Sequence, residues 1–148
     1  MTAAFLITDR KTDVAILERL LPPSLTQTIR FYAADGKSSA ISAAATLLTD
    51  RMRPIAIVLD ADTENPSEIR EKIELANTLL YPASSPEVPF KVFMAAPSIS
   101  SILSQNSPVT DPTETLDRLT PSQIQTLQQH PLIQQLIEFL SSVTQQVA

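Results

Sequence analysis

The sequence predicts an α/β fold, and three observations lead to this prediction. Short apolar runs rich in β-branched residues alternate with segments of helical periodicity over the first two thirds of the chain. One of these runs, residues 54–59, is apolar throughout, as expected of a central strand covered on both faces. From residue 97 onward the pattern is helical only. Because parallel neighbours need crossover helices, the expected architecture is Rossmann-like: a mostly parallel four-stranded sheet, helices on both faces and a helical C-terminal extension.

Length and composition are those of one globular domain. The chain has 148 residues, of which 43% are hydrophobic and 18% charged. We expect a single domain over residues 1–148, with the α/β core in residues 1–96 and the helical extension in residues 97–148. There are no cysteines, which excludes disulfides and thiolate metal sites, and a cytoplasmic location is the expectation.

The first strand is expected over residues 3–7 and the first helix over residues 12–21. Apolar side chains recur through this helix at a spacing of three to four residues: Val14, Leu17, Leu20 and Leu21. Pro22 and Pro23 then end the helix, because proline cannot continue it.

The second strand, residues 28–33, leads to the only glycine of the chain, Gly36. Keeping one glycine among 148 residues indicates a backbone position that needs a positive φ or a close approach. An alanine-rich helix should follow over residues 38–52, with Ile41, Ala45 and Leu48 on its apolar side.

The third strand covers residues 54–59 and ends abruptly at Asp60. Asn65 and Pro66 are typical of an N-cap and first helical position, so a helix is expected from there to Leu80. A proline-rich loop then leads into a fourth strand over residues 90–95.

The C-terminal third should contain a short helix near residues 99–103, a long loop over residues 105–117 and two further helices. Thr120 and Gln123 form the pattern of a capping box, which predicts a helix start. The last helix, residues 132–146, carries a broad apolar stripe. Such a stripe packs on its own domain or pairs with a second subunit, and the latter would make a homodimer.

Acidic residues follow two of the expected strands. Asp60 and Asp62 come after the third strand, and Asp9 and Asp13 come after the first. In a parallel sheet the carboxyl ends of the strands share one edge, where ligands bind. If the chain stays extended, Asp60 and Asp62 point to the same side, an arrangement suited to Mg²⁺. Asp60, Asp62 and Asp13 are therefore candidate metal ligands, although acidic residues after strands also serve as turn and cap residues.

A second candidate is a phosphate-binding segment. Gly36, Lys37 and Ser38 stand at an expected helix N-terminus, where backbone N–H groups and the helix dipole favour anions. Arg10 would lie on the same edge and is a further candidate for contacting phosphate. The alternative is a tight turn with a serine cap, and a complete P-loop is absent.

Charge and hydropathy limit the partners. The net charge is −5, which argues against nonspecific capture of nucleic acid by the whole surface. The N-terminal apolar stretch, residues 3–7, is too short for a signal segment or a membrane span, so no membrane role is expected.

At Thr8–Asp13 and Asp60–Asp62 the chain resembles the TOPRIM and TOPRIM-like domains of topoisomerases, primases and OLD-type nucleases. Their first motif has a strand, then Val-Glu-Gly, two residues and Asp, which Thr8-Asp9-Arg10-Lys11-Thr12-Asp13 resembles. Gly36 and the Asp60-Ala61-Asp62 triplet resemble the glycine turn and the Asp-x-Asp motif of the family. The resemblance covers residues 3–95 and implies Mg²⁺, phosphodiester or nucleic-acid substrates and a catalytic role for Asp9.

The sequence departs from this family at its first motif. Asp9 stands where the family has glutamate, and Arg10 stands where it has glycine. After the fourth strand, where some relatives carry glutamates, this chain has Pro97-Ser98-Ile99-Ser100. The sequence thus leaves two functions open: a metal-dependent nuclease or phosphotransferase, and a non-catalytic binding or protein-interaction module that keeps only the fold.

Overall fold

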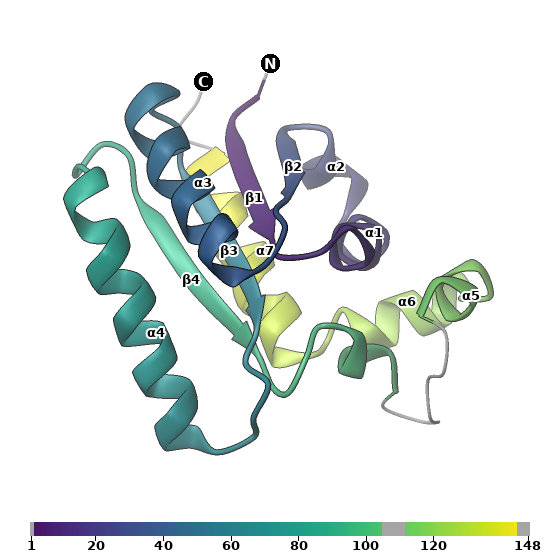
Figure 1. Cartoon of the computed structure of the whole chain (residues 1–148). Helices are drawn as coiled ribbons and strands as arrows, with labels where there is room; N and C mark the ends of the chain where they lie inside the picture. The colour runs from purple at the N-terminus through teal and green to yellow at the C-terminus, as the bar shows by residue number, and fades with distance from the viewer. Residues whose placement is uncertain (1, 105–111, 145–148) are drawn as a thin grey trace.

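The predicted α/β class is confirmed by a computed structural model, which describes residues 2–104 and 112–144 (Figure 1). Its sheet has four parallel strands in the order β2-β1-β3-β4. The strands are β1 Ala4–Thr8, β2 Ile29–Ala33, β3 Ile55–Asp60 and β4 Phe90–Ala95. The helices are α1 Lys11–Leu20, α2 Pro23–Thr26, α3 Lys37–Asp50, α4 Pro66–Leu80, α5 Pro112–Asp117, α6 Pro121–Leu127 and α7 Pro131–Thr144, with short 3₁₀ turns η1 Tyr81–Ala83 and η2 Ser100–Ser104.

The two central strands are buried along their whole length. Every residue of β1 and β3 is buried, and their register pairs Leu6 with Ala56 and Ile7 with Ile57. The edge strand β2 alternates instead, with Ile29 buried and Arg30 exposed. The continuously apolar run of residues 54–59 has its predicted position in the middle of the sheet.

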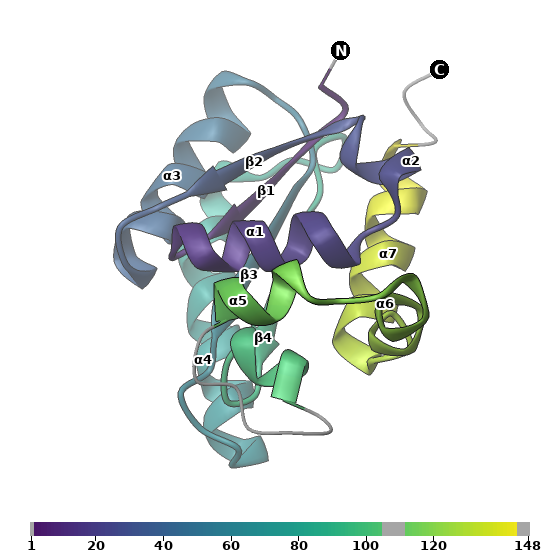
Figure 2. The same ribbon diagram turned by 90° about the vertical axis from the view of Figure 1, so that its right-hand side faces the viewer.

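Helices cover both faces of the sheet (Figures 1 and 2). One face packs against α1, α7 and the turn η2, and its core includes Leu6, Val58 and Ile99. The opposite face packs against α3 and α4, and its core includes Ile7 and Ile57. Side chains of successive residues in β1 and β3 thus enter different cores, as the pleat requires.

The local sequence explains where the helices begin. The side chain of Asn65 accepts hydrogen bonds from the backbone N–H groups of Ser67 and Glu68 at the start of α4, as an N-cap residue does. Thr120 and Gln123 form the predicted capping box of α6. Gly36 precedes α3 with a φ of 100°, which explains why glycine is kept there.

Helix α7 is part of the core rather than an extension of it. It lies against β1, β3 and β4, and its apolar stripe is buried there: Leu132, Ile133, Leu136, Leu140 and Val143. The stripe that suggested a homodimer is therefore used within the chain, and nothing in the described residues supports pairing through it.

Two short helices differ from the sequence prediction. Residues 112–117, expected in a loop, form α5, which packs on α1. The remainder of that expected loop, residues 105–111, lies outside the described residues. Pro22 ends α1 as predicted, but Pro23 then opens α2, since proline suits the first position of a helix. The end of the last predicted helix, residues 145–146, also lies outside them.

None of the helices in residues 2–104 and 112–144 has the length and apolar character needed to cross a membrane.

Candidate metal centre

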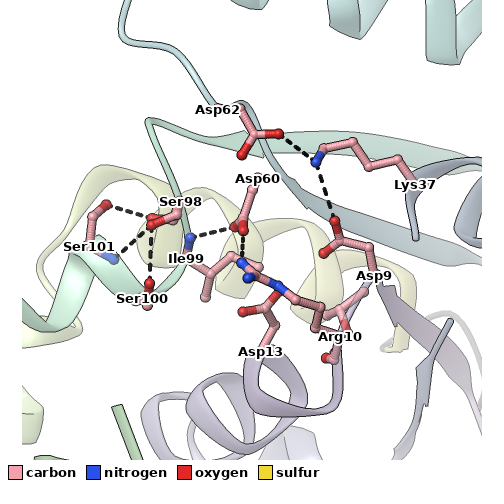
Figure 3. A network of polar contacts seen from close by, with 11 residues as sticks. Asp9, Arg10, Asp13, Lys37, Asp60, Asp62, Ser98, Ile99, Ser100 and Ser101 are labelled. Atoms are coloured by element: carbon pink, nitrogen blue, oxygen red, sulfur yellow. Dashed lines mark hydrogen bonds and ion pairs between the residues drawn. The ribbon is translucent and has the colours of Figure 1, made fainter. Parts of the chain in front are cut away.

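Three buried carboxylates meet at the carboxyl edge of the sheet (Figure 3). Asp9 follows β1 directly, Asp60 is the last residue of β3, and Asp13 lies in the first turn of α1. Their exposed fractions are only 5%, 2% and 1%, and one oxygen from each lies within 4.8 Å of the others. Since aspartate is almost never fully buried without a partner, the group requires compensating charge.

Asp60 is held on both sides of its carboxylate. The backbone N–H of Ile99 donates to Oδ1 at 2.7 Å, and the guanidinium of Arg10 pairs with Oδ2. The Ile99 contact comes from the segment between β4 and η2, where the backbone N–H and the hydroxyl of Ser101 donate to Ser98 (Figure 3). The backbone of a third segment thus fixes the orientation of the central carboxylate.

Arg10 is the main counter-charge of the cluster. It pairs with Asp60, and its Nε lies 3.6 Å from Oδ2 of Asp13. Its side chain remains 57% exposed, so the guanidinium covers the cluster from the solvent side. The prediction of a phosphate-binding Arg10 is untested, and in this structure the side chain binds carboxylates.

Asp62 lies outside the cluster. The expectation that Asp60 and Asp62 point to the same side is wrong, because the extended chain ends at Asp60 and Asp62 has a φ of 59°. Its side chain is 60% exposed and pairs with Lys37 at 2.6 Å. Lys37 also lies 3.5 Å from Asp9, so it links the cluster to the exposed carboxylate (Figure 3). Asp62 can act on a cation only from this outer position.

Two oxygens of the cluster have no hydrogen-bond partner among the described residues. They are Oδ1 of Asp9 and Oδ2 of Asp13, and both are fully buried. A buried acceptor without a donor is costly, and in native proteins such an atom usually marks a water, an ion or a proton. Among residues 2–104 and 112–144, Oδ2 of Asp13 has only the ion pair with Arg10, and Oδ1 of Asp9 is left to a water, an ion or a proton.

The crowding changes the protonation of the cluster. Burial, the charge of Asp60 and a hydrogen bond with Asp9 raise the pKa of Asp13 to about 7. Burial also raises the pKa of Asp60, although the Ile99 N–H and Arg10 oppose the shift. The ion pair with Lys37 lowers the pKa of Asp62. Near neutral pH the inner cluster therefore exchanges a proton readily, while the outer Asp62 stays charged.

The raised pKa of Asp13 gives a pH-dependent stability. Asp13 ionises near 3.8 in an unfolded chain and near 7 in the folded protein, so between these values the folded state binds more protons. The free energy of unfolding should fall as the pH rises from about 4 through about 7. Replacing Asp13 with asparagine should flatten this dependence and stabilise the metal-free protein at pH 8 by on the order of 2 kcal/mol.

Urea unfolding from pH 4 to pH 8 measures the effect. Asp35→Asn is the matched control, because Asp35 is exposed and its substitution should leave the pH dependence of the wild type in place. Parallel pH profiles for the wild type and Asp13→Asn would contradict the assignment.

The predicted phosphate segment lies beside the cluster. Gly36 and Ser38 flank Lys37 at the start of the fourteen-residue helix α3, and Ser38 is exposed. No side chain caps this N-terminus. Its first N–H groups remain available to an anion, although Lys37 itself is engaged by Asp9 and Asp62.

Two contributions were missed by the sequence analysis. One is the backbone N–H of Ile99, which no side-chain pattern reveals. The other is Lys72 of α4, whose Nζ donates to the carbonyl of Ala61. Lys72 stands three residues after the apolar Ile69, so its place beside the loop could have been inferred from the helix face that the two residues share.

Comparison with known proteins gives no relative: no protein-family model matches the chain, and no curated protein matches it.

Proposed function

We propose that the chain is a TOPRIM-like protein whose cluster of Asp9, Asp13 and Asp60 binds a divalent cation, Mg²⁺, and that it acts on or binds phosphodiesters. One observation carries the proposal. Three buried carboxylates converge within 4.8 Å, and two of their oxygens have no hydrogen-bond partner among the described residues. A hard divalent cation, which takes carboxylate oxygens as ligands, would satisfy both oxygens at once.

The surrounding groups fit this chemistry. A cation at the cluster would neutralise charge on a phosphodiester oxygen and orient the group for attack. Lys37 and Arg10 supply the positive charge that an anionic substrate needs locally in an acidic chain. Asp9, in the place of the family's glutamate, would serve as a ligand or as the base.

A specific observation favours a second, non-catalytic function. The guanidinium of Arg10 already bridges Asp60 and Asp13, which is where a cation would be bound. If Arg10 takes the place of the metal permanently, the protein keeps the fold as a binding or interaction module. The two proposals differ in whether a divalent cation displaces Arg10.

Thermal unfolding with increasing Mg²⁺ or Mn²⁺, together with cleavage of single- and double-stranded DNA and RNA, separates these functions. We expect the cation to raise the unfolding temperature of the wild type, because a ligand that binds only the folded state stabilises it. Asp60→Asn should abolish this effect. Glu64→Gln should retain the effect of the cation. This substitution removes the same charge as Asp60→Asn, but at an exposed residue outside the cluster.

Metal-dependent cleavage lost in Asp60→Asn would establish the catalytic form of the proposal. A cation effect without cleavage would leave a metal-binding module. Equal unfolding temperatures with and without cation in the wild type would overturn the metal centre and leave the second function.

A further inference from the structure

The edge strand β2 has one face that no helix covers. Helix α3 packs on β1 and β3, whereas β2 lies at the margin of the sheet (Figures 1 and 2). Ile29 and Phe31 face the core beside α1, so Arg30 and Tyr32 point to the opposite side, toward α3. Both are exposed, Tyr32 at 49%. An open channel therefore runs between β2 and α3.

Three connected hollows form this channel, which we call the β2–α3 groove. The first, about 260 Å³, is lined by Thr2, Phe5, Arg30, Arg51 and Arg53. The second, about 190 Å³, shares Arg30 and Arg51 with it and adds Tyr32. The third, about 510 Å³, begins at Tyr32 and ends at Ser38 and Ser39, next to Lys37. The groove thus joins the opposite edge of the sheet to the acidic centre.

The charge of the groove is unusual for this chain. Its three arginines come from β2 and from the α3–β3 connection, although the whole protein has a net charge of −5. No residue lining the three hollows is acidic. Within residues 2–104 and 112–144, none of the three guanidinium groups has an ion pair or a side-chain hydrogen bond. Three unpaired arginines in one channel fit a ligand with several anionic groups.

The backbone between two of these arginines is strained. Met52 adopts a φ of 52°, although it is not glycine and its side chain is 59% exposed. The sharp turn brings Arg51, at the end of α3, and Arg53, before β3, to the same hollow. This left-handed residue closes the C-terminus of α3, where the backbone N–H of Met52 donates to the carbonyl of Leu47 at 3.2 Å.

We infer that the β2–α3 groove binds single-stranded nucleic acid, with Arg30, Arg51 and Arg53 contacting phosphates and Tyr32 stacking on a base. Basic channels with an exposed aromatic ring are the usual means of binding a single strand. Five residues of β2 span about 16 Å, so several successive phosphates would lie along the groove. The inference deepens the proposed function, because such a strand would lead past Lys37 to the carboxylate cluster.

Fluorescence anisotropy with labelled oligo-dT and oligo-rU of about 12 nucleotides tests the inference, since single-strand site sizes reach about 16 nucleotides. The solution contains EDTA, so that the result does not depend on the metal centre. We expect the wild type to bind at low salt. Binding of one oligonucleotide and not the other would identify DNA or RNA as the ligand.

Replacing Arg30, Arg51 and Arg53 together with alanine should weaken binding at least about tenfold and reduce the salt dependence of log K by about 2, or about 0.7 for each lost phosphate contact. The matched control replaces Arg19, Arg70 and Arg118, three exposed arginines outside the groove, and should keep the affinity and salt dependence of the wild type. Tyr32→Ala should also weaken binding about tenfold, while Tyr32→Phe retains it, because stacking needs the ring only.

Equal weakening in the two triple variants would overturn the inference, as would a wild type that binds neither oligonucleotide. Tyr32→Ala keeps the test decisive if the triple groove variant does not fold. The outcome is separate from that of the metal centre, since the binding is measured in EDTA, where no divalent cation is available to the cluster. Loss of the cation effect alone would contradict only the proposed function.

Discussion

Replacing Leu136 with alanine should lower the free energy of unfolding by about 3 kcal/mol, within the range of about 2–5 kcal/mol for buried leucines. Leu136 lies in the middle of α7, is 0% exposed and belongs to the core shared with β1, β3 and β4. Its truncation leaves a cavity that a packed interior fills only in part. The size of the loss follows from α7 being part of the domain core.

Urea denaturation of Leu136→Ala measures this loss. Gln135→Ala is the control on the same helix, and its exposed side chain should change the stability by no more than about 0.5 kcal/mol. A loss in Leu136→Ala as small as that of the control would contradict the packing of α7 on the sheet.

Replacing Arg10 with alanine should have the second large effect, and this effect should depend on pH. Removing one partner of a fully buried ion pair costs about 3–5 kcal/mol, and we expect about 2 kcal/mol here because Arg10 is more than half exposed. The loss should appear at pH 8, where all three carboxylates repel one another. At pH 5 it should be smaller, because Asp13, whose pKa is about 7, is protonated.

Unfolding at pH 5 and pH 8, each with and without Mg²⁺, measures the Arg10→Ala effect. Saturating Mg²⁺ should restore the stability at pH 8, since the cation supplies the missing charge. Lys11→Ala removes a charge from the next residue, which is exposed and has no ion pair with the cluster in the part of the chain that the structure describes, and should show none of this dependence. The same loss at both pH values would contradict the role of Arg10 as counter-charge, whereas no recovery with Mg²⁺ would contradict the metal centre.

The convergence of Asp9, Asp13 and Asp60 could be predicted from the sequence because it depends on topology. Asp60 ends β3, Asp9 follows β1 directly and Asp13 lies in the first turn of the helix after β1, and parallel strands bring these positions to one edge. The continuously apolar residues 54–59 also identified the central strand. The central strand and the edge that carries the acidic residues could therefore be predicted from the hydrophobic pattern and the connection rules.

The rest of the site depends on individual backbone and side-chain torsion angles, which no sequence pattern determines. Asp62 leaves the cluster because its backbone is left-handed, and Arg10 turns inward through its side-chain rotamers. The Ile99 contact belongs to the backbone of a turn, which any residue type could supply. The apolar stripe of α7 predicted that one face of this helix is buried. It did not predict whether the sheet of the same chain or a second subunit covers that face.

The most direct test of the metal centre is to count the Mn²⁺ ions bound per chain by electron paramagnetic resonance at pH 8. If the cluster is a metal centre, we expect one bound ion in the wild type, none in Asp60→Asn, and retained binding in Glu64→Gln. Asp62→Asn should also retain the ion, because its carboxylate lies outside the buried cluster. No bound Mn²⁺ in the wild type, or equal binding in the wild type and Asp60→Asn, would contradict the metal centre.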